Sequence, residues 1–527
     1  MNILVVEPIA PSGIEVLRET GWNVDVRPAL TPAEMEAIIG AYEAVIVRSQ
    51  TRLTARVLRA AKRLKVIGRA GAGVDNIDLE EATARGILVM NTPGGNSVSV
   101  AEHTFGLILA LVRHIVKANE SVKRGEWERG LFLGRELKGK TLGLIGLGKV
   151  GQEVAKRAKA FGMTVIAHDP FIAERIAQEL DVRLVPLEEL LATSDVISLH
   201  ASLTRATRGM IHRETIARMK PGVILINTAR GELVDEEALL EGLDSGRIAG
   251  AGLDVFAEEP PRNRRLLEHP RVLATPHVGA STIEAQEQVG LEIVLQVREY
   301  LQSGVIRNAV NFPALSPEER QRLAPFLELG EKLGAFVAQI ARVRPSEVGI
   351  RYYGELTHFN VYPISNAILC GVLRQMLDED VNLINARAKA EERDIEIIET
   401  RSNRARSYAN LISVQLRDAE GHVDWVEGAV LHQGNLRLVS IDGVSLEIPL
   451  APHMLLVRNE DVPGVIGRIG TLLGEAQVNI GNFALARGGA EGMAIGVLTV
   501  DSPVSDDVLA EIRRIPAIRD VRVIALP

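Results

Sequence analysis

Residues 141–169 read TLGLIGLGKVGQEVAKRAKAFGMTVIAHD. An apolar run leads into Gly146-Leu-Gly148-Lys-Val-Gly151, a segment rich in Ala and Lys follows, and a second apolar run ends at Asp169. This pattern predicts a strand, a tight glycine turn, a helix and a second strand. Gly146 would make the turn, Gly148 would let the backbone approach a pyrophosphate, and Gly151 would let helix and strand pack closely.

The same stretch predicts which dinucleotide is bound. A pyrophosphate at the helix N-terminus would meet unpaired N–H groups and the positive end of the helix dipole. Asp169 lies 18 residues beyond Gly151, close to the spacing of an acid that accepts hydrogen bonds from the adenosine ribose diol. Because a carboxylate there would repel a 2′-phosphate, the sequence favours NAD over NADP.

The composition excludes several classes of protein. A chain of 527 residues is too long for one core, and three or four domains are expected. The net charge is −8 and no block of Lys and Arg occurs, which disfavours nucleic-acid and membrane-surface binding. Cys370 is the one cysteine, so an intrachain disulfide is excluded and a reducing compartment is favoured. The start, MNILVVEP, reads as a strand and a turn without a basic leader, and we predict a cytoplasmic protein.

Short strand patterns alternate with helix patterns over the first 96 residues, which predicts a small parallel α/β unit. A single long helix is expected over 99–123, with Ser99 and Glu102 spaced as a capping box. A helical pattern over 282–301 would cross back to the first unit. The predicted domains are a discontinuous unit of residues 1–96 and 284–307, a nucleotide-binding unit of 97–283, an α/β unit of 308–450 and a C-terminal βαββαβ unit of 451–527.

Polar side chains follow the last strands of the nucleotide-binding unit. Arg230 follows the run ending at Asn227, Glu259 follows the run ending near Val255, and His277 follows the run ending at Thr275. In an open parallel sheet the ligand lies beyond the carboxyl ends of the strands, so these side chains should meet at one rim. A lone loop His is more often a surface residue, but a cation, an acid and an imidazole at the same rim predict a catalytic group. No catalytic constellation and no metal site is predicted in the rest of the chain.

Six runs resemble the D-2-hydroxyacid dehydrogenase family: RAGAGVDNIDL, NTPGGNSVSVAE, GLIGLGKVGQEVA, NTARGELVDEEAL, GLDVFAEEP and TPHVGAST. Within that family the chain is similar to the long-form phosphoglycerate dehydrogenases, which add an intervening domain and an ACT domain. The resemblance implies a Rossmann-like NAD-binding domain inserted in a flavodoxin-like substrate domain. It also implies NAD-dependent oxidation of 3-phosphoglycerate to 3-phosphohydroxypyruvate at the start of serine synthesis, a homotetramer, and L-serine as a possible effector.

The resemblance also assigns roles to residues. His277 would be the base that removes the hydroxyl proton, Glu259 would orient it, and Arg230 would bind the carboxylate and the C2 oxygen. The expected cofactor-binding residues are Gly146, Gly148, Lys149, Val150, Gly151, Asp169, Ala201, Thr228, Ala229, Arg230, Asp254, His277, Gly279 and Ala280. The expected substrate-binding residues are Arg48, Ser49, Arg69, Ala70, Gly71, Asn96, Arg129, Arg230 and His277, with Arg129 supplied across a subunit interface.

Serine would contact Asn459, Asp461 and Asn479, which could equally form a structural turn and a dimer contact. Three positions depart from the family pattern. Ala72 and Ala201 replace residues that often carry a hydroxyl group, so those contacts to the cofactor would be absent. Asn459 stands where serine-regulated relatives often have His or Tyr, so serine inhibition remains a hypothesis.

Two other functions remain open from the sequence. The chain could be an NAD-binding regulatory protein, although Arg230, Glu259 and His277 argue against a pure binder. It could also be a dehydrogenase for an unphosphorylated acid, such as a hydroxypyruvate or glyoxylate reductase, although the added domains and the arginines argue against that. A panel of substrates would separate the three.

Overall fold

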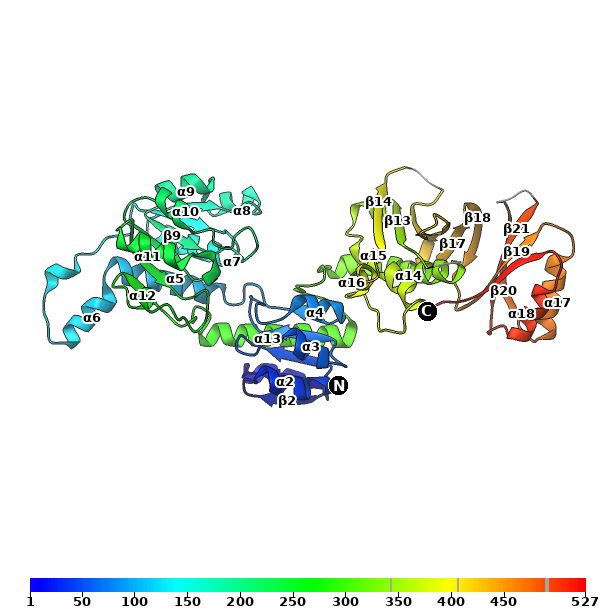
Figure 1. Cartoon of the computed structure of the whole chain (residues 1–527), viewed down its shortest axis with the longest axis horizontal. Coiled ribbons are helices and arrows are strands. Elements are labelled where there is room, and N and C mark those ends of the chain that lie inside the picture. The colour runs from blue at the N-terminus through cyan, green and yellow to red at the C-terminus, as the bar shows by residue number, and fades with distance from the viewer. Residues whose placement is uncertain (342–343, 405–406, 489–491) are drawn as a thin grey trace.

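A computed structural model of the chain describes residues 1–341, 344–404, 407–488 and 492–527. Its four β-sheets lie along an elongated molecule (Figure 1). Two parallel sheets make up the left half of the view, and a mixed sheet and an antiparallel sheet make up the right half. The mixed α/β fold class expected from the sequence is confirmed.

The first sheet has the strand order β2-β1-β3-β4-β5, which is the flavodoxin-like order. Its strands are β1 (Asn2–Val6), β2 (Asn23–Arg27), β3 (Ala44–Val47), β4 (Val66–Arg69) and β5 (Leu88–Met90). The first four helices are α1 (Pro11–Arg18), α2 (Pro32–Ile38), α3 (Ala55–Ala60) and α4 (Leu79–Ala84). Helix α13 (Ile283–Ser303) returns to this sheet and buries Ile293 and Val297 against it. Gly68 makes room for this helix, because a Cβ there would lie 2.8 Å from both side chains.

The second sheet is parallel throughout, in the order β12-β11-β10-β9-β6-β7-β8. The order reverses direction at β6, as in dinucleotide-binding folds. Its strands are β6 (Thr141–Ile145), β7 (Thr164–His168), β8 (Arg183–Leu184), β9 (Val196–Leu199), β10 (Val223–Asn227), β11 (Ile248–Leu253) and β12 (Val272–Ala274). Its helices are α5 (Ser97–Val112), α6 (Ile115–Lys123), α7 (Lys149–Ala160), α8 (Glu174–Glu179), α9 (Leu187–Thr193), α10 (Arg213–Arg218), α11 (Glu236–Asp244) and α12 (Arg264–Leu267).

The prediction of one helix over 99–123 was wrong. Helices α5 and α6 meet at an angle of 62° because His114 takes a left-handed conformation with φ 54°. The capping-box prediction was also wrong, since α5 begins at Ser97 and the Ser99 hydroxyl lies 2.7 Å from that of Thr282. In the described part of the chain no single helix has the length and apolar character to cross a membrane, and only the bent pair α5 and α6 has them jointly.

The third sheet has the order β14-β13-β15-β16-β17-β18 and is mixed, since only β13 and β14 pair in parallel. Its strands are β13 (Glu347–Gly354), β14 (Glu396–Ser402), β15 (Asn410–Arg417), β16 (Val423–Val430), β17 (Leu436–Ile441) and β18 (Val444–Pro449). Its helices are α14 (Pro317–Ile340), α15 (Tyr362–Arg374) and α16 (Ala386–Glu391).

The fourth sheet is antiparallel, in the order β20-β21-β19-β22. The elements follow as β19 (His453–Glu460), α17 (Val465–Glu475), β20 (Ile480–Arg487), β21 (Met493–Val500), α18 (Asp506–Arg513) and β22 (Ile518–Ala525), the expected βαββαβ order. One face packs against α17 and α18. The other face adds Leu456, Val497 and Ile524 to the core under α14, so the third and fourth sheets share one hydrophobic cluster.

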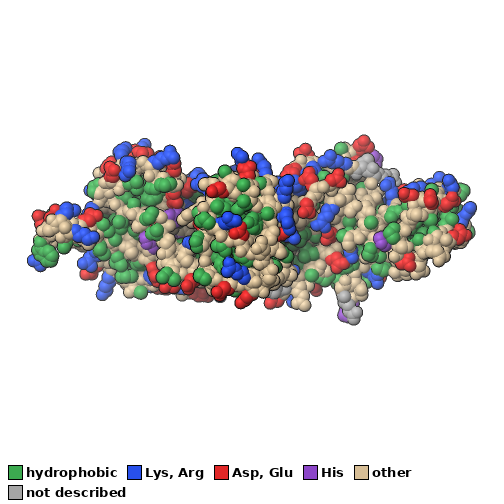
Figure 2. Space-filling model, turned by 90° about the horizontal axis from the view of Figure 1, so that it is seen from below, with side chains coloured by type: hydrophobic (Ala, Val, Ile, Leu, Met, Phe, Trp, Pro, Cys, Tyr) green, Lys and Arg blue, Asp and Glu red, His purple; other side chains and the backbone are tan. Residues whose placement is uncertain are grey.

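The surface carries charges of both signs. On the face shown in Figure 2, acidic and basic side chains are interspersed over the whole length of the molecule. Helix α6 projects at the end of the molecule, on the side of the second sheet away from the first sheet (Figure 1). The chain returns from this arm at Gly134 and Arg135, where Arg135 donates its backbone N–H to the carbonyl of Val112.

Candidate active site

The glycine turn between β6 and α7 has the geometry that its sequence predicts. Gly146 has φ 95°, and a Cβ there would lie 2.7 Å from backbone atoms of His200 and Ala201. A Cβ on Gly151 would lie 2.4 Å from the carbonyl oxygen of Gly146, so both positions require glycine. Gly148 instead faces open space, with no heavy atom within 4 Å of its would-be Cβ. A ligand can therefore approach the backbone at Gly148, and Lys149 and Val150 form the first turn of α7 beside it.

Asp169 follows β7 directly and lies beside the glycine turn. Its Oδ2 accepts a hydrogen bond from the backbone N–H of Leu147 at 2.8 Å. Its Oδ1 accepts from the backbone N–H of Phe171 at 2.9 Å. Oδ1 also accepts from the backbone N–H of Ile172 at 3.2 Å. These three bonds fix the carboxylate in place and leave one lone pair, on Oδ2, for a ribose hydroxyl. Phe171, whose ring is 94% exposed, lies at the same loop.

The loop after β10 carries Thr228, Ala229 and Arg230. The buried Thr228 hydroxyl lies 2.9 Å from the hydroxyl of Thr104 on α5. The backbone N–H of Ala229 donates to Oδ1 of Asn227 at 3.1 Å, and Asn227 also donates to the carbonyl of Arg230 at 2.8 Å. The loop is therefore held from both ends by one buried amide.

Asp254, directly after β11, organises the loop that carries the imidazole. Its carboxylate accepts from the Thr275 hydroxyl at 2.6 Å and from the backbone N–H groups of Val278 at 2.9 Å and Gly279 at 2.8 Å. His103 of α5 lies 3.3 Å from the same carboxylate. Burial alone would raise the pKa of Asp254, but these hydrogen bonds outweigh it and lower the pKa to about 2. Asp254 is therefore a permanent anion at the rim.

His277 and Glu259 form a hydrogen-bonded pair. Nδ1 of His277 lies 2.9 Å from Oε2 of Glu259. The hydrogen bond to Glu259 raises the pKa of His277 above its ordinary value. Burial would raise the pKa of Glu259, but the hydrogen bond from His277 outweighs it and lowers the pKa. Since Nδ1 is engaged, Nε2 is the ring nitrogen without a protein partner among the described residues.

His277 has an unusual backbone conformation, with φ 53°. Its N–H donates to the carbonyls of Asp254 and Thr275, which hold the residue in the left-handed region. Such a conformation in a non-glycine residue is costly and is concentrated at functional sites. The strain is consistent with a ring that must point in one direction.

Three arginines approach the rim from two sheets. Arg48 follows β3, Arg69 ends β4, and Arg230 comes from the second sheet. Burial lowers the pKa of Arg69 to about 10, and repulsion from the nearby Arg230 adds to this. Nε of Arg69 is buried and has no hydrogen-bond partner within the described chain. The arrangement is suited to an anion with more than one negative charge.

Two glycines give these guanidinium groups their space. A Cβ on Gly71 would lie 1.5 Å from Nη1 of Arg69, and a Cβ on Gly73 would lie 1.8 Å from Nη2 of Arg230. Arg69 Nη1 also donates to the carbonyl of Ala70 at 3.0 Å. The loop after β4 is thus shaped around two cations.

The remaining predicted residues lie at varied places. Ser49 is exposed beside Arg48, and Asn96 occupies the position before α5. The carbonyl of Ala280 accepts from Gln286 at 3.0 Å at the start of α13. Arg129 begins the short helix η2 (Arg129–Phe132), between α6 and β6, and it is exposed.

Within one chain the structure does not bring the predicted effector residues together, because Asn459 and Asp461 lie at one end of the fourth sheet and Asn479 lies at the opposite end. Asn459 is buried near the end of β19 and donates from Nδ2 to the carbonyl of Glu460 at 2.6 Å. Asp461 pairs with Arg487 of β20 at 2.7 Å. Asn479 is exposed, and its backbone N–H donates to Oδ1 of Asp501 at 3.1 Å. The acid expected to receive an ammonium group thus already has a cationic partner.

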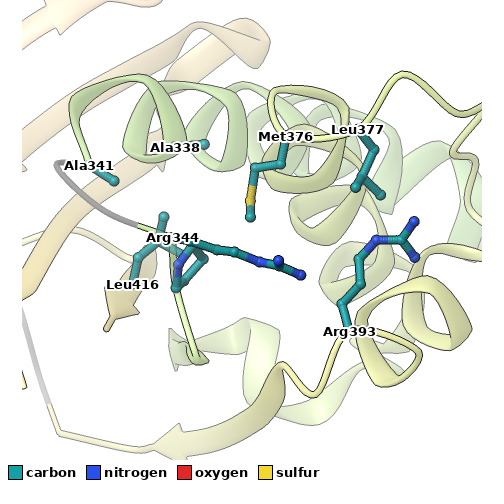
Figure 3. A pocket seen from close by; sticks show the side chains of 8 residues that line it. Ala338, Ala341, Arg344, Met376, Leu377, Arg393 and Leu416 are labelled. Atoms are coloured by element: carbon teal, nitrogen blue, oxygen red, sulfur yellow. The ribbon is translucent and has the colours of Figure 1, made fainter. Parts of the chain in front are cut away.

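A separate cavity of about 460 Å³ lies beside α14 and α15 (Figure 3), in the half of the molecule away from the second sheet (Figure 1). Met376, Leu377 and Leu416 line it, and the side chains of Arg344 and Arg393 reach into it. Arg393 is paired with Glu379 at 2.9 Å, so its charge is largely neutralised. The described lining residues of this cavity include no nucleophile and no general base.

Three further residues shape the rim and were not predicted from the sequence. Asp75 pairs with Arg230, His103 contacts Thr275 at 3.0 Å as well as Asp254, and Glu7 is buried under the loop that carries Arg48. The Glu7 carboxylate accepts backbone N–H groups of this loop, including that of Thr51 at 2.9 Å. The available signal was weak: Glu7 follows a strand directly, His103 is a polar residue within the largely apolar helix α5, and Asp75 lies in the loop after β4.

Comparison with known proteins identifies the class of protein to which the domains are similar. Residues 105–279 match the NAD-binding domain of the D-isomer specific 2-hydroxyacid dehydrogenases. Residues 322–442 match the D-3-phosphoglycerate dehydrogenase intervening domain, and residues 453–517 match the ACT domain. Among solved structures, a Thermus thermophilus protein, TT0316, is 39% identical with a TM-score of 0.55 and covers 59% of this chain and 100% of its own. The D-lactate dehydrogenase of Aquifex aeolicus, solved with NAD and lactic acid, is 33% identical with a TM-score of 0.53 over the same shares.

Full-length relatives then specify the family. The D-3-phosphoglycerate dehydrogenase of Synechocystis sp. is 41% identical over 526 residues, covering 100% of this chain and 95% of the relative. That of Bacillus subtilis is 40% identical over 526 residues and 100% of both chains. The chain belongs to the D-3-phosphoglycerate dehydrogenase family.

Proposed function

We propose that the protein oxidises the C2 hydroxyl of 3-phospho-D-glycerate to 3-phosphohydroxypyruvate with NAD, the first committed step of L-serine biosynthesis. The observation that carries the proposal is the pair of His277 and Glu259 at the same rim as Arg230. The family membership and the names of the full-length relatives support the choice of substrate.

The residues around the glycine turn fit NAD. The open side of Gly148 admits a pyrophosphate, and the N–H groups of Lys149 and Val150 at the start of α7 can donate to it. The carboxylate of Asp169 would accept from the ribose diol. Ala201, Thr228, Asp254 and Gly279 would line the nicotinamide end. When bound, NAD supplies the acceptor for the hydride that leaves C2.

His277 handles the proton of the reaction. In the neutral form its Nε2 accepts the proton of the C2 hydroxyl as the hydride departs. Glu259 holds Nδ1 protonated and stabilises the imidazolium that forms. In the reverse direction the same imidazolium returns the proton to the C2 oxygen.

The arginines bind the anionic ends of the substrate. Arg230 would take the carboxylate and the C2 oxygen, because its planar fork matches a carboxylate. Arg48 and Arg69 would take the phosphate, since both approach the rim from the first sheet. Ser49, Ala70, Gly71 and Asn96 would complete the wall of the pocket.

We extend the proposal to assembly. The projecting arm exposes Trp127 by 76%, Leu131 by 69% and Leu133 by 87%, a degree of apolar exposure that marks an interface. A second copy packed there would bring its Arg129 toward the substrate pocket, and pairing of the fourth sheets would complete a homotetramer. Light scattering of the intact chain and of a Leu131→Glu, Leu133→Glu variant tests this, since the variant should lose one level of assembly.

L-serine is the proposed effector at Asn459, Asp461 and Asn479, at an interface between paired copies, since two copies are needed to bring Asn479 to the other two residues. Binding would require the Asp461 carboxylate to exchange Arg487 for the serine ammonium group. Titration of serine against activity should give inhibition that Asp461→Ala abolishes, while Asp507→Ala on α18 should leave it unchanged.

The proposed boundaries are 1–96 with 284–307, 97–283, 308–450 and 451–527. The start of α13 at Ile283 and of β19 at His453 supports them. The single cysteine, Cys370, is buried and free, which fits the reducing cytoplasm that we propose as the location.

A substrate panel followed by NADH absorbance tests the proposed activity. Phosphohydroxypyruvate should be reduced with a kcat/KM at least about tenfold above those of hydroxypyruvate and glyoxylate, since a phosphate adds charge-assisted hydrogen bonds. A protein that ignores the phosphate would be a reductase for unphosphorylated acids. A protein that binds NADH without turnover of any acid would be a regulatory binder.

A further inference from the structure

We propose that Asp75 is a positioning residue that aims the Arg230 guanidinium at the substrate carboxylate through an ion pair joining the two parallel sheets. The inference rests on the proposed function, because it concerns the group that would hold the carboxylate of a 2-hydroxy acid. Asp75 lies in the loop after β4 of the first sheet, whereas Arg230 lies in the loop after β10 of the second sheet. The pair therefore spans the cleft between the two sheets.

The contacts fix the Arg230 guanidinium along its Nε–Nη2 edge and at Nη1. Oδ2 of Asp75 accepts from Nε of Arg230 at 2.8 Å and lies 2.8 Å from Nη2. Nη1 donates to the carbonyl of Ala229 at 2.7 Å. A guanidinium has five N–H donors in a fixed plane, so these contacts use the side edge and leave one N–H on each Nη atom. The two remaining donors form the end-on fork that matches a carboxylate.

The loop is built around this pose. Gly73 lies against the Arg230 guanidinium, where a Cβ would approach Nη2 to 1.8 Å. Any other residue at this position would push the guanidinium away from Asp75. The close approach and the ion pair together specify one orientation of a side chain that otherwise has four rotatable bonds.

The role of Asp75 can be tested by the direction in which its loss changes ligand affinity, because its charge and its positioning role predict opposite changes. A carboxylate beside a site for a di- or trianion repels the ligand, so charge alone predicts that loss of Asp75 tightens binding. Positioning predicts the opposite, because a free Arg230 must be ordered when the substrate binds. Repulsion between Arg230 and Arg69 would also displace an unanchored Arg230. Since the Asp75 side chain is 61% exposed, its pair contributes little to folding stability, and the effect should fall on binding and turnover.

The experiment compares Asp75→Ala, Asp75→Asn, Arg230→Ala and the double variant Asp75→Ala, Arg230→Ala in the full chain. Two measurements are made: KM and kcat for 2-oxo acid reduction, and the Kd of oxalate for the NADH-bound protein. The control is Glu241→Ala, a surface acid with 54% exposure that pairs with Arg213. The NADH Kd and melting temperature of each variant report on folding.

Asp75→Ala should raise KM and the oxalate Kd by roughly tenfold, the cost of freeing a bidentate donor, with the NADH Kd unchanged. The effect should be equal for phosphorylated and unphosphorylated acids, since both share the carboxylate. Asp75→Asn should stay within about threefold of the parent, because its amide oxygen still accepts from Nε and Nη2. In the Arg230→Ala background, loss of Asp75 should change neither value by more than about twofold, as expected for a residue that acts through Arg230.

Tighter binding by Asp75→Ala, or equal effects of Asp75→Ala in both backgrounds, would overturn the proposal. A chain that reduces no 2-oxo acid would refute the proposed function instead. The oxalate series would still decide the role of Asp75 in that case, because it requires no turnover.

Discussion

Nδ1 of His277 lies 2.9 Å from Oε2 of Glu259, although 18 residues separate them in the chain. The contact closes a loop that starts at β11 and continues past β12, and it fixes which ring nitrogen faces away from the protein. A carboxylate at this distance favours the charged imidazole, so the pair sets the pH at which His277 can act as a base.

Loss of Glu259 should move the pH profile. Neutral His277 is required for oxidation, and its pKa is raised, so the oxidation rate should rise with pH through a midpoint above about 6.5. In Glu259→Gln the hydrogen bond to a charged partner is lost, and burial then lowers the pKa of His277. The midpoint should shift to lower pH, measured as kcat/KM between pH 5 and 10. An unmoved midpoint would mean that another group controls the profile.

Removal of the imidazole should affect turnover far more than cofactor binding. His277→Gln should lower kcat by about 10²- to 10⁴-fold, the usual contribution of a general base. The NADH Kd, measured by fluorescence, should change by less than about threefold. A parallel loss of NADH affinity would indicate that the residue holds the loop rather than moves the proton.

Two glycines of the turn should respond differently. Gly148→Ala meets no protein atom within 4 Å, so the melting temperature should be kept while NADH affinity falls. Gly151→Ala drives a Cβ to 2.4 Å from the carbonyl oxygen of Gly146, which should cost about 1–3 kcal/mol of stability as well as affinity. Calorimetry and NADH titration of both variants check the contrast. Full NADH affinity in Gly148→Ala would place the pyrophosphate elsewhere.

Arg48 should determine preference for a phosphate. Arg48→Ala should lower the kcat/KM ratio of phosphohydroxypyruvate to hydroxypyruvate by about tenfold or more, since a charge-assisted hydrogen bond contributes about 1.5–3 kcal/mol. Arg52→Ala is the matched control, an exposed arginine four residues along the same loop. An equal drop of the kcat/KM ratio in both variants would mean that the effect comes from the loss of one positive charge and not from Arg48 itself.

The packing of α14 on α15 should tolerate no added methyl group. A Cβ on Gly371 would lie 2.1 Å from the carbonyl oxygen of Glu331, so Gly371→Ala should destabilise the third sheet by about 1–3 kcal/mol. Gly106→Ala on α5 is the control, because open space surrounds that glycine. The control should be neutral or gain up to about 1 kcal/mol from helix propensity. Urea unfolding of both variants checks the difference.

The sequence allowed the rim of the second sheet to be predicted because its signals are local. The glycine turn at 146–151 needs particular backbone space, and short apolar runs fix β10 and β12, the strands that precede Arg230 and His277. Parallel strands place such positions at one edge, so the meeting of distant residues followed from topology alone.

Other features depend on contacts that no local pattern encodes. The helical sequence pattern runs through His114 without a break, but His114 takes a left-handed conformation and the chain bends there into the projecting arm. The edge strand β2 is only half-buried, so it lacks a strong apolar run. The pairing of Asp75 with Arg230 joins residues 155 positions apart from different sheets, and only the packing of the two sheets determines it.

The shared core beneath α14 has a consequence for anyone who wishes to engineer this chain. The side chain of Gln339 makes two hydrogen bonds to the last strand, β22. Its Nε2 donates to the carbonyl oxygen of Ala525 at 2.8 Å, and its Oε1 accepts from the backbone N–H of Ala525 at 2.9 Å. A truncation ahead of His453 would remove Leu456, Val497 and Ile524 from the shared core. It would expose the apolar residues that they cover, and the shortened chain should aggregate. The fourth sheet therefore cannot be removed as an independent domain, and a chimera that contains it must also contain α14.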